Sequence, residues 1–203
     1  MTGTFDRHFS ARAKAMRASD VRELLKLLQA PDMISLAGGL PNPETFPAEI
    51  IRNIANDVLR DRADSSLQYG ITEGYLPLRE AVAERMRRKG MDVATDNVGI
   101  VSGSQQVIDL MGKVLIDPGD SIVVSAPTYL TALTGFAVYE ARFEPVPIDE
   151  ENMRMDLFED KLKSLSRDSR RPKLVYALPN FQNPAGVTMP ERNRRRLMDL
   201  ASE

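Results

Sequence analysis

The sequence contains no cysteine and a single histidine, His8, which lies close to the N-terminus. Without cysteine the protein has neither disulfide bonds nor thiolate metal sites. With only one histidine, a metal site would have to consist of carboxylates, and no acidic residues have the spacing of such a site. We therefore expect no bound metal.

Signals for membrane insertion and export are also lacking. No apolar run approaches the ~20 residues that a membrane-spanning helix needs. Residues 1–10 carry charges and have no apolar centre, unlike a signal peptide. The net charge of -2 and the pI of about 5.6 argue against a nucleic-acid-binding surface. A cytoplasmic protein of 203 residues with a sizeable core is the simplest interpretation.

Before residue 98 the sequence predicts helices separated by loops that contain glycine and proline. Ser19 is placed to cap a first helix, and Pro47 fits the first position of a second. A third helix, around residues 78–86, ends at Gly90, a residue type favoured just after helix ends. One face of the second helix is apolar and consists of Ile50, Ile54 and Val58.

From residue 98 onward, expected strands alternate with expected helices, which predicts a mainly parallel α/β sheet. The expected strands are 98–101, 121–125, 143–148 and 173–178. The expected helices begin near Ser104 or cover 129–139 and 157–165, and Thr188 with Glu191 resembles a capping box for the last one. That helix runs to Glu203 without a cap, so we expect the sequence to be cut within an α/β unit.

The segment Ser102-Gly103-Ser104-Gln105-Gln106 lies between an expected strand and an expected helix. Free backbone N–H groups and the positive end of the helix dipole favour a phosphate at such a place. Gly103 allows a close approach of the backbone, and the Ser104 hydroxyl adds a donor. The segment is neither a GxGxxG fingerprint nor a P-loop, and its plain alternative is a capped helix start with a glycine turn.

Two further segments follow expected strands. Pro127-Thr128-Tyr129 brings a tyrosine that could stack on a flat ring, or that simply belongs to the core. Asn183-Pro184-Ala185-Gly186 brings a short amide in a turn, and Asn-Pro and glycine favour a turn by themselves. Because ligands gather beyond the carboxyl ends of parallel strands, the convergence of the three segments predicts one ligand site.

The order of the motifs resembles that of fold-type-I aminotransferases, which use pyridoxal 5'-phosphate (PLP). The branch with 2-aminoadipate and kynurenine aminotransferases is the most similar, and the resemblance runs from about Arg17 to the end of the chain. The motifs that carry it are Leu36-Ala37-Gly38-Gly39-Leu40-Pro41, Phe46-Pro47, Gln68-Tyr69-Gly70-Ile71-Thr72-Glu73-Gly74, Leu78-Arg79, and the three segments described above.

The resemblance implies the α/β PLP-dependent transferase fold of type I, with an incomplete, mainly parallel sheet. Residues 1–46 would form an N-terminal helical arm and small-domain segment. Residues 47–203 would form the N-terminal part of the PLP-binding large domain. The intact protein would transfer an amino group from an amino acid to a 2-oxo acid, and it would be a homodimer.

The resemblance also assigns residues. Gly103, Ser104 and Gln105 would hold the PLP phosphate, Tyr129 would stack on the pyridine ring, and Asn183 would donate to the phenolic oxygen. Tyr69 would reach the phosphate of a neighbouring subunit. Gly39 would lie close to the substrate α-carboxylate. Arg22 would meet the substrate side chain, although a solvated helix arginine is an equal alternative there.

No residue of this chain matches the catalytic lysine of the family. The lysine that binds the cofactor, the aspartate that pairs with the pyridinium nitrogen and the arginine that binds the α-carboxylate all come later in the family pattern. The seven lysines of the chain lie elsewhere: Lys14, Lys26, Lys89, Lys113, Lys161, Lys163 and Lys173. We therefore expect these 203 residues alone to bind PLP weakly and to be inactive.

Two alternatives stay open. The chain could be a non-catalytic PLP-binding module, as in the effector domain of transcription regulators, although only 18 residues precede the Ser19 helix. It could also be one piece of a split enzyme. In either case an interrupted sheet would leave open strand edges, so we expect poor solubility or non-native association of the isolated chain. The basic runs 85–89 and 192–196 are interpreted as solvated helix faces.

Overall fold

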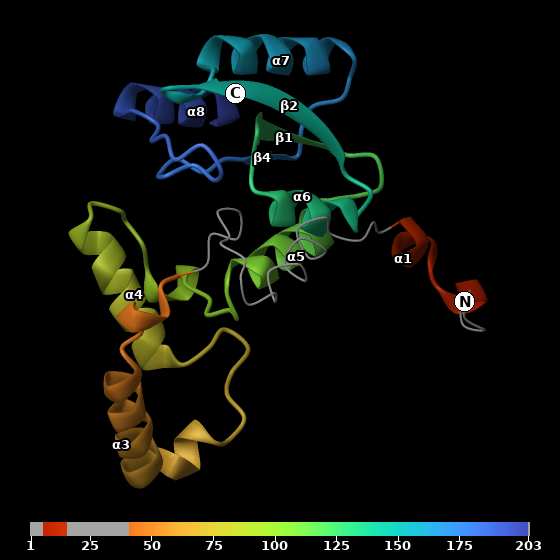
Figure 1. Cartoon of the computed structure of the whole chain (residues 1–203). Helices are drawn as coiled ribbons and strands as arrows, with labels where there is room; N and C mark the ends of the chain where they lie inside the picture. The colour runs from red at the N-terminus through yellow and green to blue at the C-terminus, as the bar shows by residue number, and fades with distance from the viewer. Residues whose placement is uncertain (1–5, 16–40, 203) are drawn as a thin grey trace, which may run out of the picture. The chain divides into compact units, whose positions relative to one another are not determined.

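A computed structural model describes residues 6–15 and 41–202 of the chain (Figure 1). The chain divides into two compact units, residues 1–16 with 102–203, and residues 17–101. The predicted helix after Ser19 and the predicted site residues Arg22 and Gly39 lie outside the described residues. The domain boundary expected between residues 46 and 47 concerns the organisation of the family and stays a prediction.

The larger unit is built on a four-stranded sheet with the order β3-β2-β1-β4. Its central strand β1 (Ser121–Ala126) pairs in parallel with β2 (Arg142–Asp149) and with β4 (Leu174–Tyr176). The short β3 (Asn152–Met153) pairs antiparallel with the end of β2. The mainly parallel sheet expected from the alternation of elements is thus confirmed.

Helices cover both faces of this sheet (Figure 1). One face carries α5 (Ser104–Leu115) and α6 (Leu130–Ala137), and the other carries α7 (Met155–Arg167) and α8 (Glu191–Ser202). Because side chains alternate along a strand, Ile122 and Val124 of β1 enter the α5–α6 core. Val123, which lies between them, enters the α7–α8 core.

Two predictions for the part of the chain after residue 97 are wrong. Residues 98–101 form no strand; instead, Ile100 donates its backbone N–H to Glu73 at 2.9 Å, a contact to a loop rather than to a strand. A short β-rich run needs a neighbouring strand before it becomes one. Thr188 does not cap α8, because the helix begins at Glu191 and the Thr188 hydroxyl accepts the N–H of Phe181 at 3.1 Å.

The smaller unit contains α3 (Ala48–Ser66) and α4 (Leu76–Arg88), with the 3₁₀ turns η2 (Pro43–Thr45) and η3 (Thr95–Asn97). The buried guanidinium of Arg79 on α4 donates to the carbonyl oxygens of Val98 at 2.8 Å and Thr95 at 3.1 Å. It thereby fixes the loop after η3. Gly90 adopts φ +85° at the end of α4, as its predicted C′ role requires.

The predicted apolar face of α3 is present but not buried. Ile50, Ile54 and Val58 are 62%, 57% and 37% exposed. In the basic run 192–196, Arg192 and Arg195 are exposed as expected, whereas Arg196 is half-buried in an ion pair with Glu159 at 2.5 Å.

The N-terminal segment contains η1 (Asp6–His8) and α1 (Ala11–Ala15), and the Arg12 guanidinium lies 6.0 Å from the ring centre of Tyr139.

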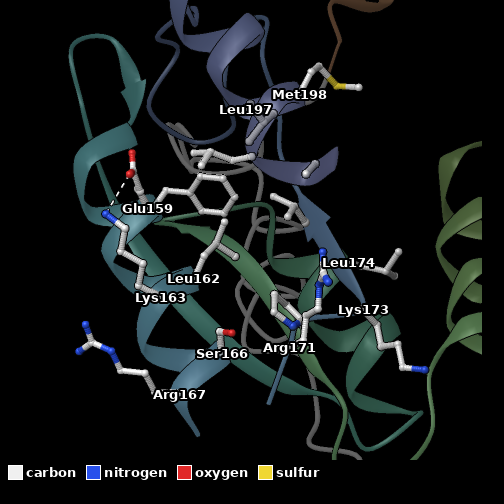
Figure 2. Close-up of a pocket in the computed structure, with 15 residues that line it drawn as sticks. Glu159, Leu162, Lys163, Ser166, Arg167, Arg171, Lys173, Leu174, Leu197 and Met198 are labelled. Atoms are coloured by element: carbon white, nitrogen blue, oxygen red, sulfur yellow. Dashed lines mark ion pairs between the residues drawn. The ribbon is translucent and has the colours of Figure 1, made fainter. Parts of the chain in front are cut away.

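A groove of about 670 Å³ follows the edge of the sheet between α7, β4 and α8 (Figure 2). Its floor is apolar, and Lys163, Arg167, Arg171 and Lys173 line it. Within the described residues no helix is long and apolar enough to cross a membrane.

Candidate functional site

The first site element is the start of α5. Gly103 precedes the helix with φ +83°, a conformation that side chains with a Cβ rarely adopt. Among the described residues no atom lies within 4 Å of the place where its Cβ would be, so they leave the backbone open to a ligand there. Within the described part of the chain, the N–H groups of Ser104 and Gln105 have no hydrogen-bond partner. Two amides at a helix start are therefore free to bind an anion.

The side chain of Gln106 fixes the conformation of this turn. Its Oε1 accepts the backbone N–H of Ser102 at 2.6 Å. The Gln106 N–H itself donates to the carbonyl oxygen of Gly103 at 3.2 Å. Gln106 thus fixes the turn through its side chain and its backbone N–H, and the first two helical amides stay available to a ligand.

The neighbouring helix α6 approaches this turn closely. A Cβ added to Gly135 would lie 3.1 Å from Nε2 of Gln105 and 2.6 Å from Cγ2 of Ile108. Ile108 is buried in the core below the turn. The missing side chain at Gly135 therefore leaves the space that the Gln105 amide occupies.

The second site element is Tyr129, the residue before the first turn of α6. Its half-buried ring packs against the cluster that includes Ile108 and Ile122. Tyr176 of β4 belongs to the same cluster; burial raises the pKa of its phenol, and the nearby phenol of Tyr129 raises it further. The Thr128 hydroxyl is buried beside them and has no hydrogen-bond partner within the described part of the chain.

The third site element is the loop after β4, which carries the exposed Asn183. The Arg194 guanidinium on α8 donates to the carbonyl oxygens of Met189 at 2.8 Å and Pro179 at 3.2 Å, and to Oδ1 of Asn180 at 2.7 Å. Arg194 thereby holds both ends of the loop together. The Asn183–Pro184 peptide bond is cis, as is Ala126–Pro127.

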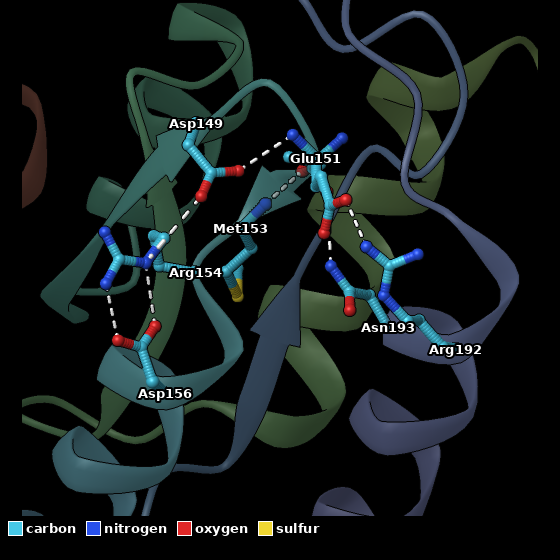
Figure 3. A network of polar contacts seen from close by, with 8 residues as sticks. Asp149, Glu151, Met153, Arg154, Asp156, Arg192 and Asn193 are labelled. Carbon is cyan, nitrogen blue, oxygen red and sulfur yellow. Dashed lines mark hydrogen bonds and ion pairs between the residues drawn. The ribbon is translucent and has the colours of Figure 1, made fainter.

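A polar network around the turn between β2 and β3 reaches Arg192 and Asn193 of α8 (Figure 3). The buried Asn152 donates from Nδ2 to the carbonyl oxygen of Leu178 at 2.9 Å. The neighbouring Glu151 binds Arg192 of α8 through an ion pair. At the other end of the network, hydrogen bonds from Arg154 lower the pKa of Asp156 to about 2. The turn is thus tied both to α8 and to the carboxyl end of β4.

The second and third site elements are joined by one side chain. Gln182 is 1% exposed, and its Nε2 donates to the carbonyl oxygen of Pro127 at 2.7 Å. Pro127 lies two residues before Tyr129, and Gln182 lies next to Asn183. The predicted convergence of these two strand-end segments is therefore present in the structure.

The structure places the predicted site residues in three groups. Gly103, Ser104, Gln105, Tyr129 and Asn183 belong to the larger unit, where Tyr129 follows β1 and Asn183 follows β4. Tyr69 belongs to the smaller unit, where its side chain is 100% exposed. Gly39 and Arg22 lie outside the described residues. The groove of Figure 2 is lined by none of these residues and is not this site.

Sequence reasoning missed the residues that shape the site rather than form its surface. Gln106, Gly135, Gln182 and Arg194 all act by contacts to residues distant in the sequence or in the next turn. The position of Gln182 beside Asn183 was the one local signal. The arrangement as a whole offers anion-binding amides, an aromatic ring and an amide, which suits a phosphorylated flat ligand. The described residues hold no cluster of acidic residues or histidine that could bind a metal.

Comparison with known proteins identifies a family. The family described as aminotransferase class I and II matches residues 31–203. The aromatic-amino-acid aminotransferase 1 of Thermococcus litoralis is 53% identical over 98% of this chain and 48% of its own length. The 2-aminoadipate transaminase of Thermus thermophilus is 42% identical over 96% of this chain and 47% of its own length. The chain thus spans about half the length of the curated relatives it matches.

A solved structure of a related aminotransferase has the same fold as this chain. The kynurenine aminotransferase of Pyrococcus horikoshii, crystallised in complex with PMP, superposes with a TM-score of 0.92 at 51% identity. The superposition covers 98% of this chain and 50% of that protein. The expected resemblance and fold are confirmed.

Proposed function

Because this chain belongs to the aminotransferase class I and II family, we propose that the protein of which it is part transfers an amino group from an amino acid to a 2-oxo acid, with PLP as cofactor. Its substrates are aromatic amino acids or 2-aminoadipate, the classes named for two of its relatives. The observation that carries the proposal is the start of α5, with a glycine at φ +83° and two amides that have no partner among the described residues.

The residues present fit the cofactor. The amides of Ser104 and Gln105, with the Ser104 hydroxyl and the open backbone at Gly103, suit a phosphate. The partly exposed ring of Tyr129 is available for stacking on a pyridine, and the buried hydroxyl of the preceding Thr128 has no hydrogen-bond partner in the part of the chain that the structure describes. The exposed amide of Asn183 is a donor for a phenolic oxygen.

PLP supplies an electron sink for breaking bonds at the α-carbon of an amino acid. The part of this chain is to hold the cofactor at three points, by its phosphate, its ring face and its phenolic oxygen. Such fixation orients the reacting bond and excludes alternative poses. The family lysine, aspartate and carboxylate-binding arginine have no counterpart here, so we assign no catalytic residue to these 203 residues and expect them to be inactive alone.

We propose further that the intact protein is a homodimer. The fully exposed Tyr69 and the exposed apolar face of α3 support this, because both need a covering surface. Tyr69 would contact the cofactor phosphate of the partner subunit. Gly39 and Arg22 would meet the substrate, at its α-carboxylate and side chain. A cytoplasmic location stays a prediction.

The experiment that tests the proposal is PLP binding by the chain of 203 residues, measured by equilibrium dialysis. Ser104→Ala should weaken binding about ten-fold, because a hydrogen bond to a charged group contributes roughly 1.5 kcal/mol or more. Ser102→Ala is the matched control, since only the backbone N–H of Ser102 makes a contact in the turn. Equal affinities for both variants and the wild type would refute a phosphate site at α5.

The alternative is a non-catalytic PLP-binding module, either an effector domain or one piece of a split enzyme. Borohydride reduction in the presence of PLP, followed by peptide mapping, separates the cases. A specific reduced adduct on one of the seven lysines would contradict our expectation of no catalytic lysine. Transamination that appears only after a second polypeptide is added would establish the split enzyme.

A further inference from the structure

We propose that Gln182 is a positioning residue that sets the ring-binding Tyr129 segment and the Asn183 loop at a fixed separation. This inference rests on the proposed PLP site and adds a residue to which no role has been assigned. Gln182 would not contact the cofactor. Its part is to couple two contacts that the cofactor makes, one with the ring face and one with the phenolic oxygen.

The geometry of the Gln182 side chain carries the proposal. Its Nε2 donates to the carbonyl oxygen of Pro127 at 2.7 Å, across a sequence separation of 55 residues. Its Oε1 accepts the N–H of Ala185 at 2.8 Å. The side-chain amide of Gln182 therefore binds the Tyr129 segment through Nε2. Through Oε1 it binds its own loop just beyond Asn183. Only an uncharged amide of this length combines a donor and an acceptor in this way.

The backbone of Gln182 is engaged as well. Its N–H donates to the carbonyl oxygen of Val187 at 2.8 Å, and its own carbonyl oxygen accepts the N–H of Gly186 at 2.5 Å. With the residue 1% exposed, every polar group of Gln182 is buried and satisfied. Removing the Gln182 amide leaves the part-buried carbonyl oxygen of Pro127 and N–H of Ala185 without these partners.

The other supports of the loop do not reach the Tyr129 segment. Arg194 joins the two ends of the loop to each other, and Asn152 holds its first residues through Leu178. Among the hydrogen bonds of the described residues, only that of Gln182 connects the loop to Pro127. Loss of this bond should therefore loosen Tyr129 and Asn183 relative to each other and leave the start of α5 unchanged.

That difference gives a specific readout. PLP uses all three contacts, whereas inorganic phosphate uses only the start of α5, with its two amides and the Ser104 hydroxyl. Gln182→Glu replaces the donor to Pro127 by an oxygen and keeps the acceptor for Ala185. Gln182→Met removes both groups at nearly constant volume. Asn152→Asp is the matched control, because it also removes a buried donor to a carbonyl of this loop but makes no contact with Pro127.

We would measure PLP affinity by equilibrium dialysis and phosphate binding by the amide NMR shifts of Ser104 and Gln105, on the full chain below its unfolding transition. Both Gln182 variants should lose about ten-fold in PLP affinity, the loss expected for one buried hydrogen bond. Their phosphate affinity should change less than about two-fold, and Asn152→Asp should keep most of its PLP affinity.

Several outcomes would overturn the inference. Unchanged PLP affinity in the Gln182 variants, or an equal loss for PLP and phosphate, would show that Gln182 does not act on the ring contacts. Unfolding of both variants while Asn152→Asp stays folded would make Gln182 a purely structural residue. If the wild type binds phosphate but not PLP, the inference and the proposed ring contacts both fail. If it binds PLP and the variants bind equally well, only the inference fails.

Discussion

Substitution of Gly135 by alanine should act on the phosphate-binding turn from a neighbouring helix. The new methyl group would lie 2.6 Å from Cγ2 of Ile108 and 3.1 Å from Nε2 of Gln105. Contacts this short cannot persist, so one of the two side chains has to move. Ile108 is held in the core, whereas Gln105 is exposed and free to turn away. We therefore expect Gln105 to be displaced from the start of α5.

The magnitude follows from two opposing effects. Overpacking at such a contact costs about 1–3 kcal/mol in the free energy of unfolding. The better helix propensity of alanine raises the free energy of unfolding by about 1 kcal/mol. The net loss of stability should therefore be about 0–2 kcal/mol, small enough for the variant to fold. Displacement of the Gln105 side chain should disturb the phosphate-binding turn and weaken PLP binding about three- to ten-fold, an effect of the size of one lost hydrogen bond.

Gly112→Ala is the matched control on the same helix pair. Its methyl group would lie 2.4 Å from Cδ2 of Tyr139, whose hydroxyl is bonded to Asp109 at 2.7 Å. Overpacking is at least as severe there but lies away from Gln105. Urea unfolding followed by circular dichroism measures stability, and equilibrium dialysis measures PLP affinity. If both glycine variants lose equal affinity, the effect comes from general loosening of α5 and α6, and the reasoning about Gln105 is wrong.

Three further predictions concern other parts of the molecule. Arg79→Met should lower the free energy of unfolding by about 2–4 kcal/mol, because it leaves the carbonyl oxygens of Val98 and Thr95 without donors. The control Arg85→Met, at an exposed position of the same helix, should cost less than about 0.5 kcal/mol. Urea unfolding measures both variants, and equal losses would refute the role of Arg79. Hydrogen bonds from Arg196 and then Lys163 lower the pKa of Glu159 from 4.5 to about 2, so its contribution to stability is present above pH 4.5 and is lost as the pH falls towards 2. The melting temperature of Glu159→Gln should therefore fall less than that of the wild type across this range, and parallel curves would argue against the ion pair. Finally, β4 leaves an edge beside the groove of Figure 2, so light scattering of the isolated chain should show association, and a monodisperse monomer would contradict this.

The alternation of strands and helices after residue 98 was readable from the sequence because it depends on local patterns. The apolar run at 121–125 became the central strand β1, and the glycine at 90 ended α4 with the predicted positive φ. The start of α5 at Ser104 was also predicted correctly, since a glycine followed by serine and an apolar stripe is a local helix-start signal. Seven motifs in one order sufficed to predict the family, which comparison with known proteins then confirmed.

Local sequence patterns gave wrong predictions where a contact with another segment determines the conformation. Residues 98–101 have strand propensity but contact a loop at Glu73, and Thr188 has a capping side chain that binds Phe181 instead. The apolar face of α3 was predicted, yet the sequence does not say that it is exposed. In the first two cases the contact that decides the outcome lies outside the local pattern, seven residues away for Thr188 and further for Ile100.

The sequence by itself determined the periodicity of the elements, the turn glycines and the family, because each of these depends on residues within one or two turns of each other or on motif order. Only the tertiary structure decided that Gln182 joins the loop of Asn183 to the segment of Tyr129, and that Gly135 makes room for Gln105. The physical reason is that hydrogen bonds and close packing between separate segments depend on distances of a few tenths of an ångström, which the packed fold sets and the local sequence does not encode.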